Sequence, residues 1–385
     1  MNSTNELPVP DADALAHSER MAAHIRAAIG AAGGWISFAR YMDLALYAPG
    51  LGYYSAGARK LGAAGDFITA PEISPLFGHT LARQVREVLN EGLEEILEVG
   101  AGSGALAAAL LEELERLNAL PARYLILELS ADLRERSRDT LAARVPHLLE
   151  RVAWLNQLPP SFCGLVLGNE VLDAMPVHLV RQHAGRLDEL GVEIANGAFC
   201  FAPHPAEEAL RQAAPGLPLP EDYRTEIGLA AQAFMRSLGA CLEKGVVLFI
   251  DYGFPAREFF HPERREGTLM CHYRHRAHAD PFFLPGLQDI TAHVDFSAIA
   301  AAAAEDELEL VGYTTQAQFL INCGITGILA RVPPEDAARY LPLSNQANRL
   351  LSPAEMGELF KVIAFSKNRP APLLGFSQGD RRHTL

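Results

Sequence analysis

Cysteine is scarce in this chain, and basic residues are fewer than acidic ones. The sequence has 385 residues but only 5 cysteines, and no two of them are arranged as CxxC. We therefore expect neither a disulfide framework nor a zinc site, and we interpret the cysteines as reduced thiols. Lysine and arginine total 33 against 47 aspartates and glutamates, which gives a formal net charge of −14. Broad nucleic-acid binding needs clustered positive charge, so we expect no nucleic-acid partner.

Long apolar runs are also missing. No run approaches the roughly 20 residues that a membrane-spanning helix needs, so no membrane span is expected. The N-terminus carries Glu6, Asp11 and Asp13, and it lacks the basic and apolar segments of a secretory signal or transit peptide. We therefore expect a cytoplasmic location. The apolar content of 49% is ordinary for a globular protein that buries a sizeable core.

What the sequence does contain is a regular alternation of apolar strand segments and helical periodicity. The predicted strands are 95–99, 123–129, 151–155, 164–168, 246–251, 308–313 and 360–365, and the predicted helices are 76–91, 104–117, 131–144 and 226–242. Apolar strands separated by helices are typical of a parallel sheet covered on both faces. The chain is therefore predicted to have an α/β fold.

Other segments surround or interrupt this alternation. The predicted boundaries are 1–75 for N-terminal helices and a flap, 76–367 for the core, 176–225, 252–295 and 314–358 for insertions within it, and 368–385 for a loose tail. The Gly-rich stretch 48–75 is too long for an ordinary connection and holds several aromatic residues. Long loops in compact domains are usually functional or disordered, so we interpret this stretch as a flap over a ligand.

A glycine-rich turn follows the first predicted core strand. The letters ILEVGAGSG cover residues 96–104. Gly100, Gly102 and Gly104 would let a ligand approach the backbone closely at the start of a helix. Glu98 would hold the loop or an amine of the ligand. A glycine loop by itself also fits a dinucleotide site, or a turn that only packs a helix.

A second acid, Glu128, ends the next predicted strand and narrows the ligand class. Glu128 could accept hydrogen bonds from both hydroxyls of a ribose, as an acid does in dinucleotide sites. Dinucleotide sites, however, prefer no carboxylate immediately before the loop, where this chain has Glu98. The two acids therefore favour S-adenosyl-L-methionine (SAM) over a dinucleotide. Asp66 and Thr69 in the flap could contact the carboxylate or amine of SAM, although Thr69 could instead cap a helix.

Polar side chains follow the strand predicted at 164–168, at the sheet edge that carries the glycine loop. Methyl transfer needs a nucleophile held about 3 Å from the methyl group, and paired carboxylates suit the forked donors of a guanidinium. We interpret Asn169, Glu170 and Asp173 as catalytic, with the two acids on one face of a helical turn. A compatible alternative is a helix N-cap formed by Asn169. Asp251, after the next strand, either borders the substrate or terminates the strand.

Histidine spacing in the third quarter of the chain suggests a metal site on first inspection. His272, His275 and His278 are three residues apart, with Asp280 and His293 nearby. A spacing of three does not gather ligands on a strand, and the segment is too irregular to predict a helix. We therefore expect no metal, although one of these histidines could accept a proton.

These motifs, in this order, resemble the MidA-like family of SAM-dependent methyltransferases. That family includes the mitochondrial complex I assembly-factor type and bacterial relatives. The similarity covers about residues 20–367. It rests on GYY at 52–54, GDFIT at 65–69, PEIS at 71–74, the loop at 98–104, the segment 169–176, DYG at 251–253 and QDITAHVDF at 288–296. Ala70 departs from the pattern, which has serine at this position.

The resemblance implies a class I methyltransferase fold, which is Rossmann-like with a seven-stranded, mostly parallel sheet. It implies that the glycine loop and Glu128 bind SAM and that Asn169, Glu170 and Asp173 face the substrate. For the mitochondrial members it also implies symmetric dimethylation of an arginine on a complex I core subunit. We therefore expect a protein arginine N-methyltransferase with a protein substrate. The alternatives are methylation of a small molecule or another side-chain nitrogen, and a SAM-binding assembly chaperone. The segment 314–358 could be a homodimer surface or a substrate clamp.

Overall fold

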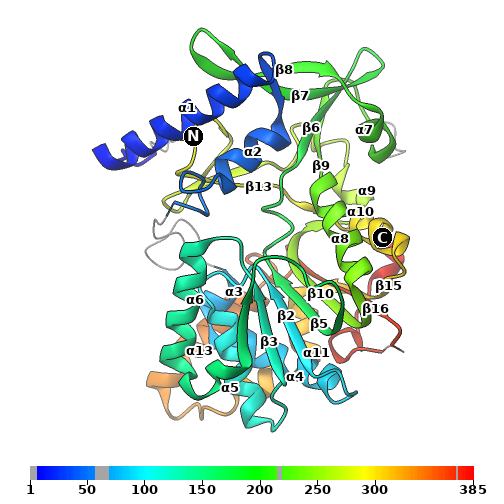
Figure 1. Ribbon diagram of the computed structural model, residues 1–385. Coiled ribbons are helices and arrows are strands. Elements are labelled where there is room, and N and C mark those ends of the chain that lie inside the picture. Colours follow the sequence, from blue (N-terminus) through cyan, green and yellow to red (C-terminus); the bar gives the residue numbers. More distant parts are fainter. Residues whose placement is uncertain (1–6, 57–68, 215–218, 370–371) are drawn as a thin grey trace. The chain divides into compact units, whose positions relative to one another are not determined.

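The computed structural model describes residues 7–56, 69–214, 219–369 and 372–385. These residues fall into two compact units, each built from three stretches of chain (Figure 1). Unit 1 comprises Met1–Ile68, Ala174–Ala231 and Ala256–His293, and unit 2 comprises Thr69–Asp173, Gln232–Pro255 and Val294–Leu385. The chain therefore passes from one unit to the other several times. The predicted boundaries near residues 75 and 367 divide the chain into consecutive segments, whereas each unit combines three separate stretches.

Unit 2 contains the sheet that the sequence predicts. Its strands are β2 (Glu95–Val99), β3 (Arg123–Leu127), β4 (Val152–Leu155), β5 (Phe162–Asn169), β10 (Leu242–Phe254), β14 (Val294–Asp295), β15 (Glu309–Thr315) and β16 (Phe360–Lys367). Seven of them follow the order β15-β16-β10-β5-β2-β3-β4, and the two-residue β14 pairs beside β10. Pairing is parallel from β10 to β4, whereas β16 is antiparallel to both of its neighbours. The prediction of an α/β fold with a mostly parallel sheet is confirmed.

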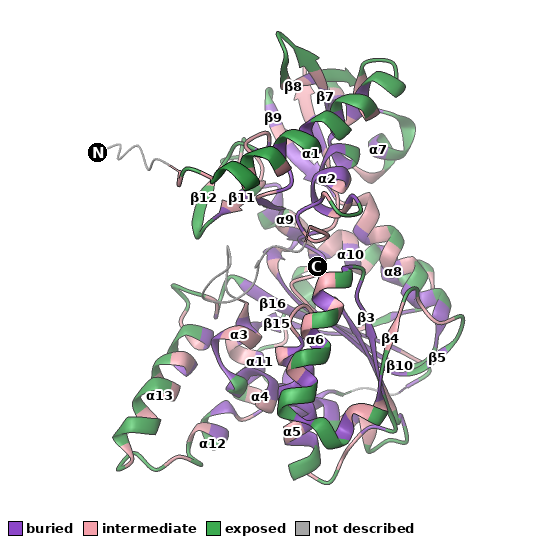
Figure 2. Cartoon of the chain, turned by 60° about the vertical axis from the view of Figure 1, so that its left-hand side comes forward, coloured by how far each residue is buried: buried purple, intermediate pink, exposed green. Residues whose placement is uncertain are grey.

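Helices cover both faces of this sheet. They are α3 (Ala70–Ile73), α4 (Pro75–Leu89), α5 (Ala105–Arg116), α6 (Ala131–Arg144), α8 (Leu229–Cys241), α10 (Phe296–Glu305), α11 (Gln316–Asn322), α12 (Ile325–Leu329) and α13 (Ala337–Leu351). In β10, Leu248 packs into the core cluster shared with α4 and α5, whereas the next residue, Phe249, contacts Phe234 of α8. Successive side chains of a strand point to opposite faces, so central strands are apolar throughout. Figure 2 shows these strands buried and the outer faces of α5, α6 and α13 exposed.

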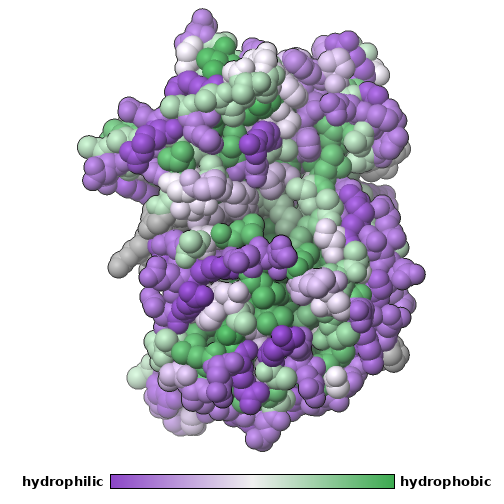
Figure 3. Space-filling model, viewed as in Figure 1, coloured by the Kyte–Doolittle hydropathy of each residue, from purple (hydrophilic) through white to green (hydrophobic). Residues whose placement is uncertain are grey.

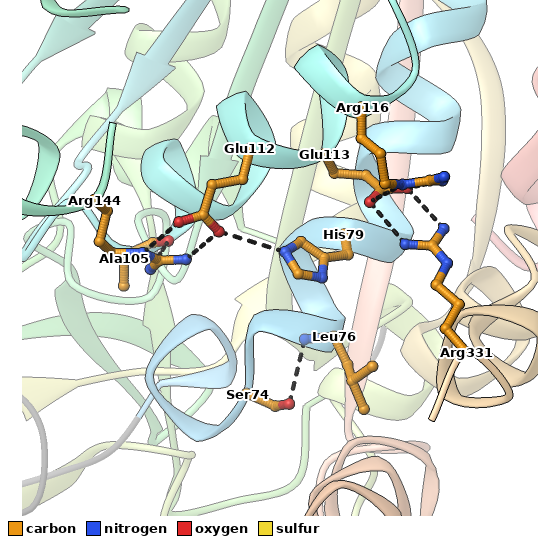
Figure 4. Close-up of polar contacts among 9 residues, drawn as sticks. All are labelled: Ser74, Leu76, His79, Ala105, Glu112, Glu113, Arg116, Arg144 and Arg331. Atoms are coloured by element: carbon orange, nitrogen blue, oxygen red, sulfur yellow. Dashed lines mark hydrogen bonds and ion pairs between the residues drawn. The ribbon is translucent and has the colours of Figure 1, made fainter. Parts of the chain in front are cut away.

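Helices α4 and α5 approach each other closely. A side chain at Gly78 of α4 would lie 2.6 Å from Cβ of Ala109 of α5, so this contact depends on two small residues. Beside it, His79 of α4 lies 3.5 Å from the carboxylate of Glu112 (Figure 4). Burial lowers the pKa of His79. Arg144 of α6 completes this group through an ion pair with Glu112 at 2.7 Å.

A second ionic group fixes the helical segment 316–351 to α5. Glu113 is buried, and its carboxylate pairs with Arg116 at 2.7 Å and with Arg331, just beyond α12, at 2.8 Å (Figure 4). Burial raises the pKa of Glu113, but hydrogen bonds from the two arginines outweigh it and bring the pKa to about 2. Ser74 caps α4 by accepting a hydrogen bond from the backbone of Leu76 at 3.2 Å. Helices α4, α5, α6 and α12 are thus held together at their polar faces as well as in the core.

The C-terminal tail is packed on unit 2, so the prediction of a loose tail is wrong. Leu373 and Phe376 are buried, and the ring of Phe376 lies 5.4 Å from that of Phe319 on α11. Gly312 of β15 leaves the room that Phe376 occupies. Further along the tail, Asp380 accepts a hydrogen bond from the backbone of Tyr313 at 3.3 Å. Glycine and proline content indicated flexibility, but two apolar side chains supply enough buried surface to order the segment.

Unit 1 brings the N-terminal segment together with two of the predicted insertions. One antiparallel sheet has β1 (Trp35–Ser37), β6 (His178–His183), β7 (Arg186–Ala195), β8 (Ala198–Pro205) and β9 (Tyr223–Ile227), and a smaller one has β11 (Met270–Tyr273), β12 (Arg276–His278) and β13 (Asp289–Thr291). The helices are α1 (Ala12–Ala31), α2 (Phe38–Tyr47), α7 (Glu208–Ala213) and α9 (Ala256–Phe259). Met21, Leu179 and Ile290 share one core cluster, so all three stretches of chain fold as one body.

The visible surface is mainly polar, with apolar side chains showing between charged ones (Figure 3). The large apolar residues that are most exposed in unit 2 are Leu129, Ile321 and Leu341. Scattered exposed apolar residues are normal in globular proteins. Among the described residues, no helix combines the length and the apolar character that crossing a bilayer requires.

Candidate functional site

The glycine loop connects β2 to α5 at the edge of the parallel sheet. Gly100, Gly102 and Gly104 all have positive φ, at 66°, 55° and 78°. Only glycine adopts this left-handed region without strain. At Gly104 a side chain would also lie 2.9 Å from Cα of Ser137 on α6. The three predicted glycines therefore form a tight turn in which Gly100 is exposed and Gly104 is buried against α6.

Glu128 follows β3 and contacts this loop directly. Its Oε2 accepts a hydrogen bond from the backbone of Gly102 at 3.2 Å, and its Oε1 accepts one from the backbone of Ser130 at 2.9 Å. Burial raises the pKa of Glu128, and these backbone donors act against that effect. The structure thus brings together the two predicted halves of the cofactor site, the glycine loop and the second acid.

Glu98 lies beneath the loop and is buried. It accepts a hydrogen bond from the hydroxyl of Tyr124 at 2.7 Å, across β2 and β3. Burial raises the pKa of Glu98 to about 7, although the Tyr124 hydrogen bond lowers it. Of the two roles predicted for Glu98, this contact corresponds to holding the strand that carries the loop. Contact with an amine of the ligand stays a prediction.

Asn169 and Glu170 lie at the end of β5, next to β2 in the sheet. Glu170 has φ of 54°, which is uncommon for a residue other than glycine. Its Oε1 accepts hydrogen bonds from Nδ2 of Asn169 at 3.1 Å and from the backbone of Ala70 at 3.3 Å. A left-handed conformation of this kind costs about 1–3 kcal/mol and occurs preferentially at functional sites.

Asp251, near the end of β10, determines the shape of the turn that follows Glu170. It is fully buried, and its Oδ2 accepts hydrogen bonds from the backbones of Val171 and Leu172 at 3.0 and 2.8 Å. Burial raises the pKa of Asp251 well above its ordinary value, and the nearby charges of Asp173 and Glu170 raise it further. Three carboxyl groups therefore lie close together at the ends of two adjacent strands.

The turn itself differs from the prediction. Residues 170–175 form bends and turns and not a helix. Glu170 and Asp173 therefore do not share a helical face, and Asn169 does not act as a helix N-cap. The physical reason is that the backbone N–H groups of Val171 and Leu172 are bound by Asp251, which lies 80 residues further along the chain. Asn169 uses its amide nitrogen to orient Glu170.

The side chain of Asn169 carries a polar atom that has no hydrogen-bond partner among the described residues. Oδ1 of Asn169 is buried and accepts no hydrogen bond from any residue that the structure describes. A buried acceptor without a donor costs about 1–3 kcal/mol, so a donor supplied by a ligand would be favourable here. The atom belongs to the same side chain that orients Glu170, so the same ligand group could reach both residues.

The described part of the predicted flap contributes one short helix to the site. Asp66 lies outside the described residues. Thr69 precedes α3, and its side chain does not cap that helix. Within α3, Glu72 accepts a hydrogen bond from the hydroxyl of Ser103 in the glycine loop. Tyr54, earlier in the stretch, donates to Asp289 inside unit 1 at 2.9 Å.

Two neighbours of the site were missed from the sequence. Glu72 belongs to the PEIS segment at 71–74, and its contact with Ser103 links residues 31 positions apart. Leu129 follows Glu128 directly, and its side chain is 75% exposed. The only sequence signal for Leu129 is its position directly after the second acid.

The predicted histidine segment lies in unit 1. His272 is on β11, His278 is on β12, and His275 is in the turn between them with φ of 62°. Within the described ranges, a group with metal-binding geometry is formed instead by His183, Glu221 and Asp222, which are at the surface. Exposed acidic groups of this kind are common without a metal, so this group adds no functional assignment.

Comparison with known proteins identifies close structural relatives. A family model described as "Putative S-adenosyl-L-methionine-dependent methyltransferase" matches residues 76–314. A crystal structure from Burkholderia thailandensis bound to S-adenosyl-homocysteine is 55% identical, has a TM-score of 0.95, and is matched over 99% of this chain and 100% of that chain. A second crystal structure from Burkholderia thailandensis is 53% identical, with a TM-score of 0.92 and the same coverage.

Curated relatives are more distant in sequence. The mitochondrial protein arginine methyltransferase NDUFAF7 of Mus musculus is 30% identical, over 86% of this chain and 81% of that protein. The homologue from Drosophila melanogaster is 27% identical, over 98% of this chain and 93% of that protein. The similarity to these proteins therefore extends well beyond the matched core and includes most of both units.

Proposed function

Because the chain belongs to this family of SAM-dependent methyltransferases, we propose that it methylates an arginine side chain of a protein. Family membership and the relative that binds S-adenosyl-homocysteine identify SAM as the cofactor. The acceptor is a separate question, because many methyltransferases share one cofactor site. The observation that carries the proposal is the group of Asn169, Glu170 and Asp173 beside the glycine loop, with Asp251 beneath it.

The residues around the loop fit SAM chemically. The left-handed turn leaves the backbone at Gly100 and Gly102 accessible to the methionine part of SAM. The Glu128 carboxylate has lone pairs beyond those used by Gly102 and Ser130, so it can also accept hydrogen bonds from ribose hydroxyls. Leu129 offers an exposed apolar surface for the adenine ring. Bound there, SAM supplies a methyl group on a positively charged sulfur.

The acidic group fits a guanidinium. Glu170 and Asp173 would accept its N–H donors in a fork, and Oδ1 of Asn169 would accept another. Holding the positive charge on one side of the guanidinium leaves the opposite nitrogen directed at the methyl group. That nitrogen forms the new N–C bond as the C–S bond breaks and S-adenosyl-homocysteine leaves. The extra proton on the methylated nitrogen then passes to a neighbouring carboxylate or to water.

Relatives support this choice of acceptor over the alternatives. The mouse and Drosophila proteins are named protein arginine methyltransferases. On the family resemblance, we extend the proposal to a subunit of respiratory complex I as the protein substrate. A homodimer is the oligomeric state to be tested. A cytoplasmic location is not supported by the relatives, which are named mitochondrial. It stays a prediction from the sequence alone.

The deciding experiment adds wild-type protein or the Glu170→Gln variant to an extract from a strain that lacks the gene. The methylation of proteins in the extract is then compared. With radiolabelled SAM, wild-type protein is expected to label a protein band whose mass spectrum shows methylarginine. Loss of the carboxylate charge should lower turnover by about 100-fold, since charged hydrogen bonds at the acceptor contribute about 1.5–3 kcal/mol each. Calorimetry should show unchanged affinity for S-adenosyl-homocysteine. Glu115→Gln, at an exposed position on α5, is the matched control.

Each alternative function predicts a different result in this experiment. Label in a small molecule or on another side-chain nitrogen would contradict the arginine proposal. Cofactor binding without any labelling would favour an assembly chaperone. Full turnover by Glu170→Gln would remove this carboxylate from the catalytic group even if the product is methylarginine.

A further inference from the structure

The short helix α3 contacts both halves of the site in unit 2. At its first residue, the backbone N–H of Ala70 donates to Oε1 of Glu170 at 3.3 Å. At its third residue, the Glu72 carboxylate accepts the hydroxyl hydrogen bond of Ser103. Ser103 is the only residue of the 100–104 loop with a polar side chain. A side-chain hydrogen bond therefore joins the glycine loop to α3, and a backbone hydrogen bond joins α3 to the carboxylate of Glu170.

The surroundings of α3 leave it little freedom to move independently. Ala70 and Ile73 are buried, and Ser74 is buried where it caps the start of α4. Helix α4 in turn packs closely on α5 through Gly78, and α5 starts where the glycine loop ends. Packed interiors transmit displacements because they have few voids. A shift of the loop at Ser103 would therefore be passed to α3 and not absorbed.

We propose that Glu72 is a positioning residue that couples the cofactor loop to the carboxylate of Glu170. When the cofactor orders the loop, the hydrogen bond from Ser103 to Glu72 holds α3 in place. The N–H of Ala70 then fixes Glu170 in the orientation that receives the acceptor. Glu72 touches neither reactant in this account. The role in turnover rests on the proposed function, whereas the coupling itself depends only on cofactor binding.

Hydrogen exchange measures this coupling directly, because the Ala70 amide is one of its contacts. The probe is S-adenosyl-homocysteine added to the full-length protein. In wild type, the probe is expected to slow exchange in the 100–104 loop and also at Ala70, Glu72 and Ile73 in α3. In Glu72→Ala, the loop should still be protected, while the protection of α3 by the probe should be lost.

Conservative and partner variants distinguish coupling from a merely structural contact. Glu72→Gln keeps a side-chain oxygen that accepts from Ser103, so it should restore the protection of α3 by the probe. Ser103→Ala removes the donor and should behave like Glu72→Ala, and combining the two should add nothing, as expected for one shared contact. Methyl transfer by Glu72→Ala should fall about tenfold in kcat through misplacement of Glu170, with affinity for the probe within about threefold of wild type.

Clear results would overturn the proposal. One is a probe effect on α3 that is the same in wild type, Glu72→Ala and Ser103→Ala. Another is the absence of any probe effect on α3 in wild type. If Glu72→Ala does not fold, Ser103→Ala provides the same comparison. Because S-adenosyl-homocysteine binding needs no acceptor, failure of the arginine proposal would leave the exchange result intact, and the two proposals fail separately.

Discussion

Tyr124 on β3 donates its hydroxyl to the carboxylate of Glu98 on β2 at 2.7 Å, with both side chains fully buried. Burial raises the pKa of Glu98 to about 7 and raises that of Tyr124 as well. The pair joins β2, which leads into the glycine loop, to β3, which Glu128 follows directly. Its protonation state therefore affects the stability of the sheet edge on which the cofactor site is built.

Replacing Glu98 with glutamine should reduce the pH dependence of stability. Because the pKa of Glu98 is higher in the folded protein than in the unfolded chain, its contribution is fully present below about pH 4.5 and is lost as the pH rises through 7. Wild type should lose about 2 kcal/mol more than Glu98→Gln between pH 5 and pH 8. Urea unfolding of both proteins at the two pH values measures this difference.

Tyr124→Phe is the companion variant. It removes the hydrogen bond that lowers the pKa of Glu98, so the loss of stability should move to higher pH. Parallel pH profiles for wild type and Glu98→Gln would show that the carboxyl group has the same proton affinity in the folded and unfolded states.

Local patterns in the sequence predicted the framework of the site. The predicted strand 95–99 and helix 131–144 have the observed bounds of β2 and α6. Both rest on interactions between residues close in sequence. Strand β2 is a mainly apolar run that ends before a glycine. Helix α6 is capped by Ser130, whose hydroxyl accepts a hydrogen bond from the backbone of Leu133 at 3.2 Å. The glycine loop and Glu128 were predictable for the same reason, since the loop begins directly after β2 and Glu128 directly follows β3.

Contacts between distant parts of the chain were not predictable in this way. The segment after Glu170 suggested a helical turn, but Asp251 binds its backbone from another strand. Residues 35–37 lie in the stretch predicted to form N-terminal helices, yet they pair with β7, and Ser37 caps a helix that begins at Phe38. Burial of the tail likewise depends on room left by Gly312. In each case the deciding partner lies many residues away.

Gly104→Ala should destabilise the protein and weaken cofactor binding. The added methyl group would meet the α6 backbone at Ser137, in a conformation that already disfavours alanine. Gly92→Ala is a matched control, because Gly92 has φ of 81° but open space around it. Left-handed strain costs about 1 kcal/mol in both variants, and overpacking should add about 2 kcal/mol in Gly104→Ala alone. Urea unfolding and calorimetry with S-adenosyl-homocysteine give the two quantities, and equal losses would contradict the predicted clash.

Phe376→Ala should show that the tail is part of the core of unit 2. Phe376 is buried against Phe319, so truncation should cost about 3 kcal/mol of unfolding free energy. His383→Ala alters an exposed residue of the same tail and should change stability by less than about 0.5 kcal/mol. Denaturant unfolding of the two variants checks both values. A loss for Phe376→Ala as small as that for His383→Ala would mean that the tail does not stabilise the fold.

Asp251→Asn should lower turnover while leaving cofactor affinity near that of wild type. The asparagine oxygen can still accept from Val171 and Leu172, but its NH2 group replaces Oδ1, which accepts from the backbone of Tyr252 at 3.1 Å. Two donors would then face each other, and the turn that carries Glu170 should shift. A misplacement of about 1 Å lowers reaction rates by up to roughly 100-fold. Labelling with radioactive SAM and calorimetry with S-adenosyl-homocysteine separate the two effects.

Asp295→Asn controls for the loss of a buried aspartate. Asp295 in unit 2 also accepts two backbone hydrogen bonds, from Ser297 at 3.0 Å and Ala298 at 3.2 Å, where it caps α10. Each substitution should cost about 1 kcal/mol of stability, because each weakens hydrogen bonds to backbone N–H groups. Of these two aspartates, only Asp251 binds the turn after Glu170, so only Asp251→Asn should reduce turnover by tenfold or more. A similar reduction in both variants would trace the effect to general destabilisation, and the backbone of the turn would then have no specific part in placing the acceptor.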